Sequence, residues 1–264
     1  MIIICFLLFE IDFIKEACMT EIGRVNCYGH CAVPDGWAAK VYSDINRLYY
    51  IHSGKGGFVH KGKYTDFKAG RLYFFPFLVE AELISDNVDR IVHSYCNFEL
   101  IPPIIAGDVL EYDPRGDEIT ESAVSVFVAG ARLRGRSRAS LTFNINDEFD
   151  RLCKNAISFL ASKTADASGA SAINDSAVVD AIKLIHSSFS DNLTVSDIAA
   201  RYYMNTDSFI RRFRKVIGMT PYAYLKKLRV RTAFYLRELG MPLEKIAKET
   251  GYSDASSLLH ALAD

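Results

Sequence analysis

The pattern of hydrophobic and polar positions is helical over residues 193–264, and it appears there twice. An Ile-Ala pair at 198–199 is followed by Phe209 and Phe213, and a second Ile-Ala pair 48 residues later is followed by Leu258 and Leu262. Residues four apart share one face of a helix. Each copy therefore predicts a helix, a tight turn and a second helix that packs on the first.

The predicted turns and helix starts are similar in the two copies. Gly251 follows the second Ile-Ala pair by four residues, where the sharp turn favours a left-handed backbone. The second helix begins at Asn205 or Thr206 in the first copy, and at Ser253 or Asp254 in the second. These residue types cap free backbone donors at helix starts.

Two such hairpins joined by one long helix are typical of helix-turn-helix DNA-binding proteins, in which the second helix of each hairpin lies in a major groove. A single match is weak evidence, because any helical hairpin shares the apolar spacing. With the buried residues turned inward, the outer faces predict the contacts to DNA bases. These residues are Thr206, Asp207, Ile210 and Arg211 in the first copy, and Ala255, Ser256, Leu259 and His260 in the second.

Charge is unevenly distributed along the chain, although its net value is only −1. From residue 176 onward there are 13 Lys and Arg and 9 Asp and Glu, and residues 208–231 contain eight basic residues and no acidic ones. A charge run alone usually marks a solvated helix face. Here it coincides with the predicted recognition helix, which favours phosphate contact. The predicted phosphate ligands are Arg212, Arg214, Lys215, Lys226 and Lys227.

From Trp37 to about Pro102 the pattern changes to short alternating segments, which are typical of strands. Strands are expected at 47–52, 58–64, 71–75, 80–84 and 90–98, with a hairpin at Gly62. Their spacing predicts a small barrel or jelly roll. Helical spacing then returns in two amphipathic segments, 119–133 and 149–160.

The predicted fold class is therefore α+β. We expect a barrel domain at 19–118, a helical region at 119–165, a linker at 166–176 and the helix-turn-helix domain at 177–264. The linker overlaps a stretch at 162–175 that is rich in Ser, Ala, Gly and Asp. The apolar run at 2–9 is too short to span a bilayer. We interpret residues 1–18 either as a buried element or as an extension upstream of a start at Met19.

The C-terminal motifs resemble those of the AraC/XylS family of bacterial transcription regulators. Residues 213–224 read Phe-Arg-Lys-Val-Ile-Gly-Met-Thr-Pro-Tyr-Ala-Tyr, which fits the family signature F-(K/R)-K-x-x-G-x-(S/T)-P-x-x-Y. Segments 228–236 and 246–254 match as well, so the resemblance covers roughly 176–264. It implies an effector-responsive, homodimeric regulator of the activator type that binds double-stranded DNA and contacts RNA polymerase. The two helices at 119–160 would pair across the dimer or pack on the barrel.

The front half resembles the family's cupin-like effector domain more loosely, through glycine turns between 53 and 76. This resemblance implies a small-molecule effector, with a sugar as one class. His93 and Tyr95 alternate on one strand and share a face, and a similar strand in sugar-responsive members carries a histidine and an aromatic that contact effector. Core packing is an equally good interpretation for any single residue. The effector-binding candidates are Trp37, Tyr42, Tyr73, Glu80, Glu82, His93 and Tyr95.

No catalytic chemistry is expected from the sequence. A cupin metal centre needs two closely spaced histidines, a carboxylate and a further histidine, but the strand directly after Gly57 offers only His60 and no His-x-His pair. No nucleophile–base constellation is found, and we predict no cofactor, no metal and no enzyme activity. The six cysteines follow no disulfide framework. Free, reduced thiols predict a cytoplasmic protein.

The second copy departs from the family pattern at its end. The family's closing basic stretch does not follow it, and the last helix ends on Asp264, an acidic residue beside the negative end of the helix dipole. We therefore hypothesise that the second module is shortened and binds DNA weakly or frays. Two alternatives stay open: a regulator that is inactive on DNA and acts through a protein partner, and a cupin-like enzyme with a DNA-binding tail.

Overall fold

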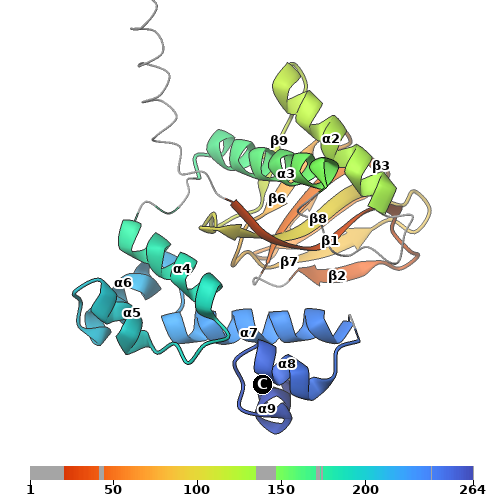
Figure 1. Cartoon of the computed structure of the whole chain (residues 1–264). Helices are drawn as coiled ribbons and strands as arrows, with labels where there is room; N and C mark the ends of the chain where they lie inside the picture. The colour runs from red at the N-terminus through yellow and green to blue at the C-terminus, as the bar shows by residue number, and fades with distance from the viewer. Residues whose placement is uncertain are drawn as a thin grey trace, which may run out of the picture.

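In the computed structural model the chain forms a β-sheet domain covered by two helices, followed by a helical domain (Figure 1). The structure describes residues 21–41, 45–134, 147–170, 173, 175–238 and 240–263. The apolar run at 2–9, the extension predicted for 1–18 and Tyr42 lie outside these residues. Among the helices that it describes, none has the length and apolar character needed to cross a membrane.

The described strands form two antiparallel sheets, and this mixed architecture confirms the predicted α+β class. The five-stranded sheet has the order β1 (Glu21–Ala32), β8 (Val92–Ile101), β3 (Asn46–Ser53), β6 (Leu72–Phe75) and β9 (Leu110–Tyr112). The four-stranded sheet has the order β2 (Ala38–Val41), β7 (Ala81–Ser85), β4 (Gly56–His60) and β5 (Lys63–Asp66). The hairpin predicted at Gly62 joins β4 to β5, and Gly62 has a φ of 76°.

Strands β1, β2 and β9 were not predicted from the pattern. In β1 the pairing with β8 shifts register between Ile22 and Arg24 and again between Val25 and Cys27. A bulge moves the following side chains to the opposite face, so the alternation that marks a strand is broken. β2 and β9 have four and three residues, too few for a clear alternation.

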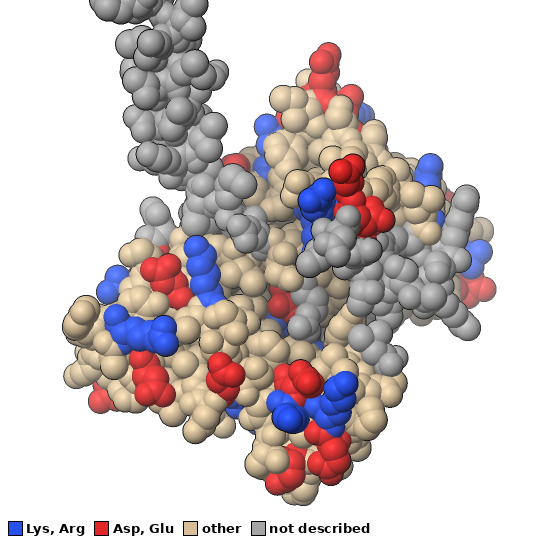
Figure 2. Space-filling view, in the orientation of Figure 1, with Lys and Arg blue, Asp and Glu red and all other residues tan. Residues whose placement is uncertain are grey.

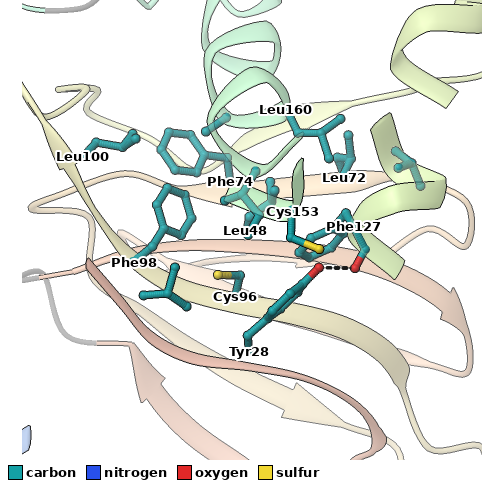
Figure 3. Packing of buried hydrophobic residues seen from close by; sticks show 14 of the residues in the cluster. Tyr28, Leu48, Leu72, Phe74, Cys96, Phe98, Leu100, Phe127, Cys153 and Leu160 are labelled. Atoms are coloured by element: carbon teal, nitrogen blue, oxygen red, sulfur yellow. Dashed lines mark hydrogen bonds between the residues drawn. The ribbon is translucent and has the colours of Figure 1, made fainter. Parts of the chain in front are cut away.

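The five-stranded sheet has an apolar core on each face. One face packs against α2 (Glu118–Arg134) and α3 (Glu148–Ala167), with Leu48, Phe74, Cys96 and Phe98 beneath the helices (Figure 3). Tyr28 stacks on Phe127 of α2 and donates its hydroxyl hydrogen bond to the Phe127 carbonyl. The other face packs on the four-stranded sheet through a second core, in which half of the buried residues are aromatic.

Helix α3 is longer than predicted and continues to Ala167. Thr164 and Ala165 are buried on its sheet-facing side, which extends the packing surface past residue 160. Residues 162–167, which the composition assigns to a linker, therefore belong to a helix. A sequence of small residues with little apolar periodicity can still form a helix where that helix packs closely on a sheet.

The helical domain contains two helix-turn-helix modules, α5–α6 and α8–α9, joined by α7. A core of fifteen buried hydrophobic residues joins α4, the first module and part of α7 to Phe77 of the β-domain, and it includes Phe209, Phe213 and Ile217. The second module has a core of only four, Ala233, Ile246, Ala247 and Leu258. The helices are α4 (Ser176–Ser188), α5 (Val195–Arg201), α6 (Thr206–Ile217), α7 (Pro221–Glu238), α8 (Leu243–Glu249) and α9 (Ala255–Ala263).

The helix ends show which of the candidate capping residues act. The Asn205 side chain accepts a hydrogen bond from the Ser208 N–H at 2.8 Å, and Asp254 accepts one from the Ser257 N–H at 2.7 Å. These bonds satisfy amide groups that the first helical turn leaves free. Helix α6 ends on Gly218, whose φ of 84° is left-handed, as the C-cap position favours.

The two domains contact each other through apolar side chains and one buried carboxylate. The rings of Phe77, after β6, and Tyr224, on α7, lie 5.7 Å apart. Glu99 on β8 is 6% exposed and accepts a hydrogen bond from Arg231 Nε at 2.9 Å. Its other oxygen lies 3.7 Å from His186 Nδ1 on α4. A single acidic residue of the β-domain thus meets basic groups from two helices.

Candidate nucleic-acid interface

Helix α6 separates a buried apolar face from an exposed polar one. Phe209, Phe213 and Ile217 are fully buried against the rest of the domain. Asp207 and Arg211 are exposed, and the neighbouring Thr206 and Ile210 are half-buried. The four residues predicted to contact bases therefore lie on the accessible side of a helix that is fixed from behind.

Helix α9 has the same arrangement with different chemistry. Leu258 is fully buried, Ser256, Leu259 and His260 are exposed, and Ala255 is half-buried. Within α9 the only titratable side chain is that of His260, whereas α6 carries three arginines and a lysine. Lysine and arginine side chains are therefore concentrated on α6 and are missing from α9.

The residues predicted to bind phosphate differ in solvent exposure and in their side-chain partners. Arg214, Lys215 and Lys227 are exposed and Lys226 is half-buried. Arg212 instead donates from Nε to Asp175 at 2.8 Å, and Asp175 also caps α4 by accepting from the Val178 N–H. On the face of the helical domain seen in Figure 2, basic and acidic side chains alternate and form no continuous basic patch.

A second candidate site lies between the sheets, around His93. The ring of His93 lies 4.9 Å from that of Tyr49, 5.2 Å from that of Tyr95 and 5.9 Å from that of Trp37. His93 is 4% exposed, and its Nδ1 atom has no hydrogen-bond partner among the described residues. Buried polar atoms are normally satisfied, so this nitrogen marks a position where a ligand or a water belongs.

Glycine at position 29 shapes this site. A Cβ atom there would lie 2.9 Å from the Tyr95 hydroxyl oxygen and 3.0 Å from its ring. The Tyr95 ring can therefore lie flat across β1 only because residue 29 has no side chain.

The other predicted effector residues do not join the His93 cluster. Tyr73 is fully buried, and its hydroxyl accepts a hydrogen bond from the Lys68 N–H at 2.8 Å. Glu82 alternates with the buried Ala81 and Leu83 and faces solvent, and Glu80 is exposed as well. Tyr49 completes the cluster but was missed, because its approach to His93 depends on the pairing of β3 with β8.

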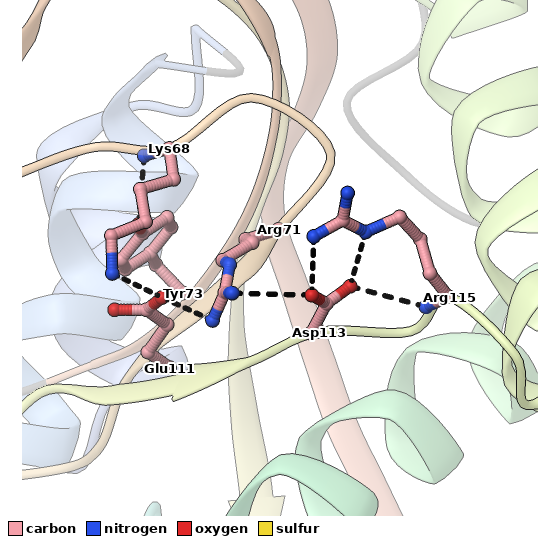
Figure 4. Close-up of polar contacts among 6 residues, drawn as sticks. All are labelled: Lys68, Arg71, Tyr73, Glu111, Asp113 and Arg115. Carbon is pink, nitrogen blue, oxygen red and sulfur yellow. Dashed lines mark hydrogen bonds and ion pairs between the residues drawn. The ribbon is translucent and has the colours of Figure 1, made fainter.

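The Tyr73 hydroxyl lies beside a chain of charged groups at the β6–β9 edge (Figure 4). Glu111 binds Arg71 at 2.7 Å and Lys68 at 3.3 Å, and Asp113 binds Arg71 at 3.2 Å and Arg115 at 2.6 Å. These ion pairs add to the backbone pairing of β9 with β6, which has only three paired positions. Tyr73 is thus held at this edge by its hydrogen bond with Lys68, and its ring is part of the hydrophobic core between the sheets.

Burial, reinforced by the nearby His30 and His52, lowers the pKa of His93 from 6.5 to about 4. His93 is therefore neutral at pH 7, and its uncharged ring has one nitrogen that donates a hydrogen bond and one that accepts. Within the described ranges, no three His, Cys, Asp or Glu residues are grouped so that they could hold a metal ion. His60 contacts the carbonyl oxygens of Glu80 and Gly107 at 2.6 and 3.1 Å.

The depressed pKa of His93 predicts a pH-dependent stability. The unfolded chain takes up a proton near pH 6.5 and the folded chain only near pH 4, so the free energy of unfolding falls as the pH falls through this window. The full loss from His93 is about 3 kcal/mol. Urea unfolding at pH 7 and pH 5 measures the part of this loss that develops above pH 5, about 2 kcal/mol, and His93→Gln is expected to reduce the difference. Equal pH dependence in both proteins would contradict this account.

Comparison with known proteins agrees with this architecture. A family model described as a helix-turn-helix domain matches residues 198–263. The chain is similar to ToxT from Vibrio cholerae strain SCE256 with a bound unsaturated fatty acid, at 14% identity and a TM-score of 0.57, covering 92% of each chain. It is also similar to ToxT from Vibrio cholerae O395 bound to (E)-4-(8-methylnaphthalen-1-yl)but-3-enoic acid, at 15% identity and a TM-score of 0.59, covering 89% of this chain and 93% of that one. No curated protein matches the chain.

Likeness to solved structures at this identity establishes the shared fold. The matched helix-turn-helix segment begins within α5 and ends within α9, so it spans both modules and the connecting helix α7. A β-sheet domain followed by this pair of modules is the arrangement that the sequence motifs imply. Residues 198–263 match the helix-turn-helix domain model, and the chain as a whole shares the fold of the ToxT structures.

Proposed function

We propose that this protein is a cytoplasmic, sequence-specific transcription regulator whose DNA binding is controlled by a small molecule held near His93. The observation that carries the DNA-binding part is α6, a helix with its apolar face buried and with Arg211 exposed on the other. Such a helix fits a major groove, where an arginine binds guanine through two hydrogen bonds.

The experiment that tests DNA binding is selection of the full-length protein against random duplexes at two salt concentrations. Enrichment of a motif, with affinity that falls steeply in salt, would support a specific regulator. Folded protein that binds no duplex at either salt concentration would instead favour a regulator that acts through a protein partner. Enrichment of one short half-site would mean that the first module binds alone.

Two substitutions on α6 separate base contact from phosphate contact. Arg211→Ala is expected to cost about 1–3 kcal/mol of binding and to relax preference at one base pair. Arg214→Ala is expected to weaken binding to all sequences alike and to reduce the salt slope by about 1. Both residues are exposed on one helix, so each variant is the control for the other. Identical effects on specificity would overturn the assignment of Arg211.

The ligand site is supported by the unpartnered Nδ1 of His93 beside Trp37 and Tyr95. Neutral hydrogen-bonding groups and flat aromatic rings suit an uncharged polar molecule such as a sugar. The ToxT structures carry carboxylic acids with large apolar parts, which makes such acids the second class to test.

The chain contains a single tryptophan, Trp37, so intrinsic fluorescence reports on this site directly. Titration with a panel of monosaccharides and of fatty acids is expected to change the emission for one class only. His93→Phe should abolish that change, while Tyr64→Phe, an exposed position on β5, should not. A saturable change that survives His93→Phe would move the ligand site elsewhere.

A homodimer is supported by an exposed apolar stripe on α3. Phe149 is 37% exposed, Leu152 50% and Phe159 38%, and their spacing places them along one side of the helix. Leu152→Glu is expected to shift the protein to monomer in analytical ultracentrifugation, with Ser158→Glu as the control on α3. An unchanged sedimentation coefficient would exclude this stripe as the interface. Contact with RNA polymerase and activation of transcription stay predictions of the family resemblance.

A further inference from the structure

Arg229 on α7 is bound to the end of α4. Its Nε donates to the Phe189 carbonyl oxygen at 2.7 Å, and its Nη2 donates to the Asp191 carbonyl oxygen at 2.8 Å. Phe189 is the C-cap residue of α4, where carbonyl groups have no partner within the helix and carry negative partial charge. The planar guanidinium thus fixes α7 to the segment that leads into the first module.

The same guanidinium lies against the turn of the second module. A Cβ atom at Gly251 would lie 2.9 Å from Arg229 Nη2 and 3.0 Å from its Cζ, and 2.8 Å from the Ser190 carbonyl oxygen. The turn between α8 and α9 therefore approaches both the arginine and the 189–191 segment. We call this contact between Arg229, the segment 189–191 and Gly251 the Arg229 clamp.

The first module shows that the turn itself does not demand glycine. Tyr203 occupies the position 48 residues before Gly251, and its φ of 53° is left-handed like the 75° of Gly251. The Tyr203 side chain is fully exposed, so nothing crowds it. At Gly251, by contrast, a side chain would collide with Arg229. The close approach, more than the backbone conformation, accounts for the glycine in the second copy.

The second module has few other contacts that set its rotation about α7. Four buried hydrophobic residues form its core, and two of them, Ala233 and Ala247, are alanines. Alanine contacts are small and permit one helix to turn or slide on another. The two hydrogen bonds of Arg229 hold its guanidinium in place on the 189–191 segment, and the close approach at Gly251 means that the α8–α9 turn cannot rotate toward that segment without displacing the guanidinium.

We propose that Arg229 is a positioning residue that fixes the distance and rotation between α6 and α9, and so sets the spacing of the two DNA half-sites. This inference rests on the proposed DNA binding of both modules. Two recognition helices held rigidly can enter two major-groove segments only when the segments have one separation. If the second module were loosely held, several separations would be tolerated.

Arg229→Lys tests the clamp because it keeps the positive charge and loses the planar fork of donors. The DNA probes are duplexes with both half-sites of the selected motif, whose separation is varied by single base pairs. The wild-type protein is expected to lose about tenfold in affinity when the separation moves by two base pairs. The variant should lose this discrimination and keep wild-type affinity for a duplex with one half-site. Arg237→Lys, on an exposed turn of α7, is the matched control.

A DNA-free measurement makes failure of the clamp distinguishable from failure of DNA binding. In residual dipolar couplings from the full-length protein, one alignment tensor is expected to fit α5–α6 and α8–α9 together, whereas Arg229→Lys should require two. Gly251→Ala, which pushes the guanidinium aside, should have the same effect and serves if Arg229→Lys does not fold. One tensor for both variants, or unchanged spacing discrimination, would overturn the proposal.

Discussion

Replacing Glu99 by alanine is expected to release the helical domain from the β-domain. Glu99 is 6% exposed, and the side chains of its partners Arg231 and His186 are only 13% and 10% exposed. Removal of the carboxylate takes from Arg231 and His186 the group that they share, and breaking a buried ion pair costs about 3–5 kcal/mol. Separation of the two domains avoids this cost, because Arg231 is then exposed to water.

Scanning calorimetry and small-angle scattering detect this separation. The wild-type protein is expected to unfold in one transition, and Glu99→Ala in two, with a larger radius of gyration before the first. Glu82→Ala is the matched control, because Glu82 is exposed on β7. Glu99→Gln keeps the shape and removes the charge, so it shows how much of the effect is electrostatic. A single, unshifted transition in Glu99→Ala would exclude Glu99 as the residue that holds the domains together.

Replacing Phe213 by alanine is expected to unfold the first module and abolish DNA binding. Phe213 is fully buried, and its ring lies 5.9 Å from that of Phe209 and 5.8 Å from that of Tyr224. Truncation of a buried phenylalanine costs about 3–5 kcal/mol, from lost transfer energy and from the cavity that remains. Because Phe213 lies on the inner face of α6, the outer face loses its support as well.

Circular dichroism during urea unfolding measures the loss, and fluorescence anisotropy with the selected duplex measures binding. Phe234→Ala provides the control, since Phe234 lies on α7 at 39% exposure with Arg237 stacked on its ring. That variant is expected to lose about 1 kcal/mol at most. If the two variants were equally stable, the core around Phe213 would be looser than its burial indicates.

Local patterns in the sequence predict most of the helical domain. Helical spacing, capping residues and turn glycines act within a few residues of one another, so the periodicity of Phe209 and Phe213 shows directly which face of α6 is buried. The strands β3 to β8 are predicted for the same reason. Strand β1 is missed because its two register shifts break the alternation that a local pattern requires.

The sequence does not predict the contacts between residues that lie far apart along the chain. Glu99 and Arg231 are 132 residues apart and Arg212 and Asp175 are 37 apart, and no periodicity links either pair. Arg212 was predicted as a phosphate ligand from its place in a basic run, yet its guanidinium binds the capping residue of α4. The rings of Trp37 and Tyr95 lie close to that of His93, and Tyr49 joins this cluster only through strand pairing. The role of the cluster in effector binding stays a prediction.

The size difference between the two helical cores has a consequence for amide hydrogen exchange. A region opens at a free energy set by the apolar surface that it buries. The cluster around the second module has four buried hydrophobic residues, whereas the cluster around α4 and the first module has fifteen, with contributions from Phe77 and α7. We therefore expect the backbone amides of α8 and α9 to exchange through local opening. Those of α6 are expected to exchange only when a larger unit of the protein unfolds. Any DNA that engages α9 must close this opening equilibrium, and part of its binding free energy is used to order the second module.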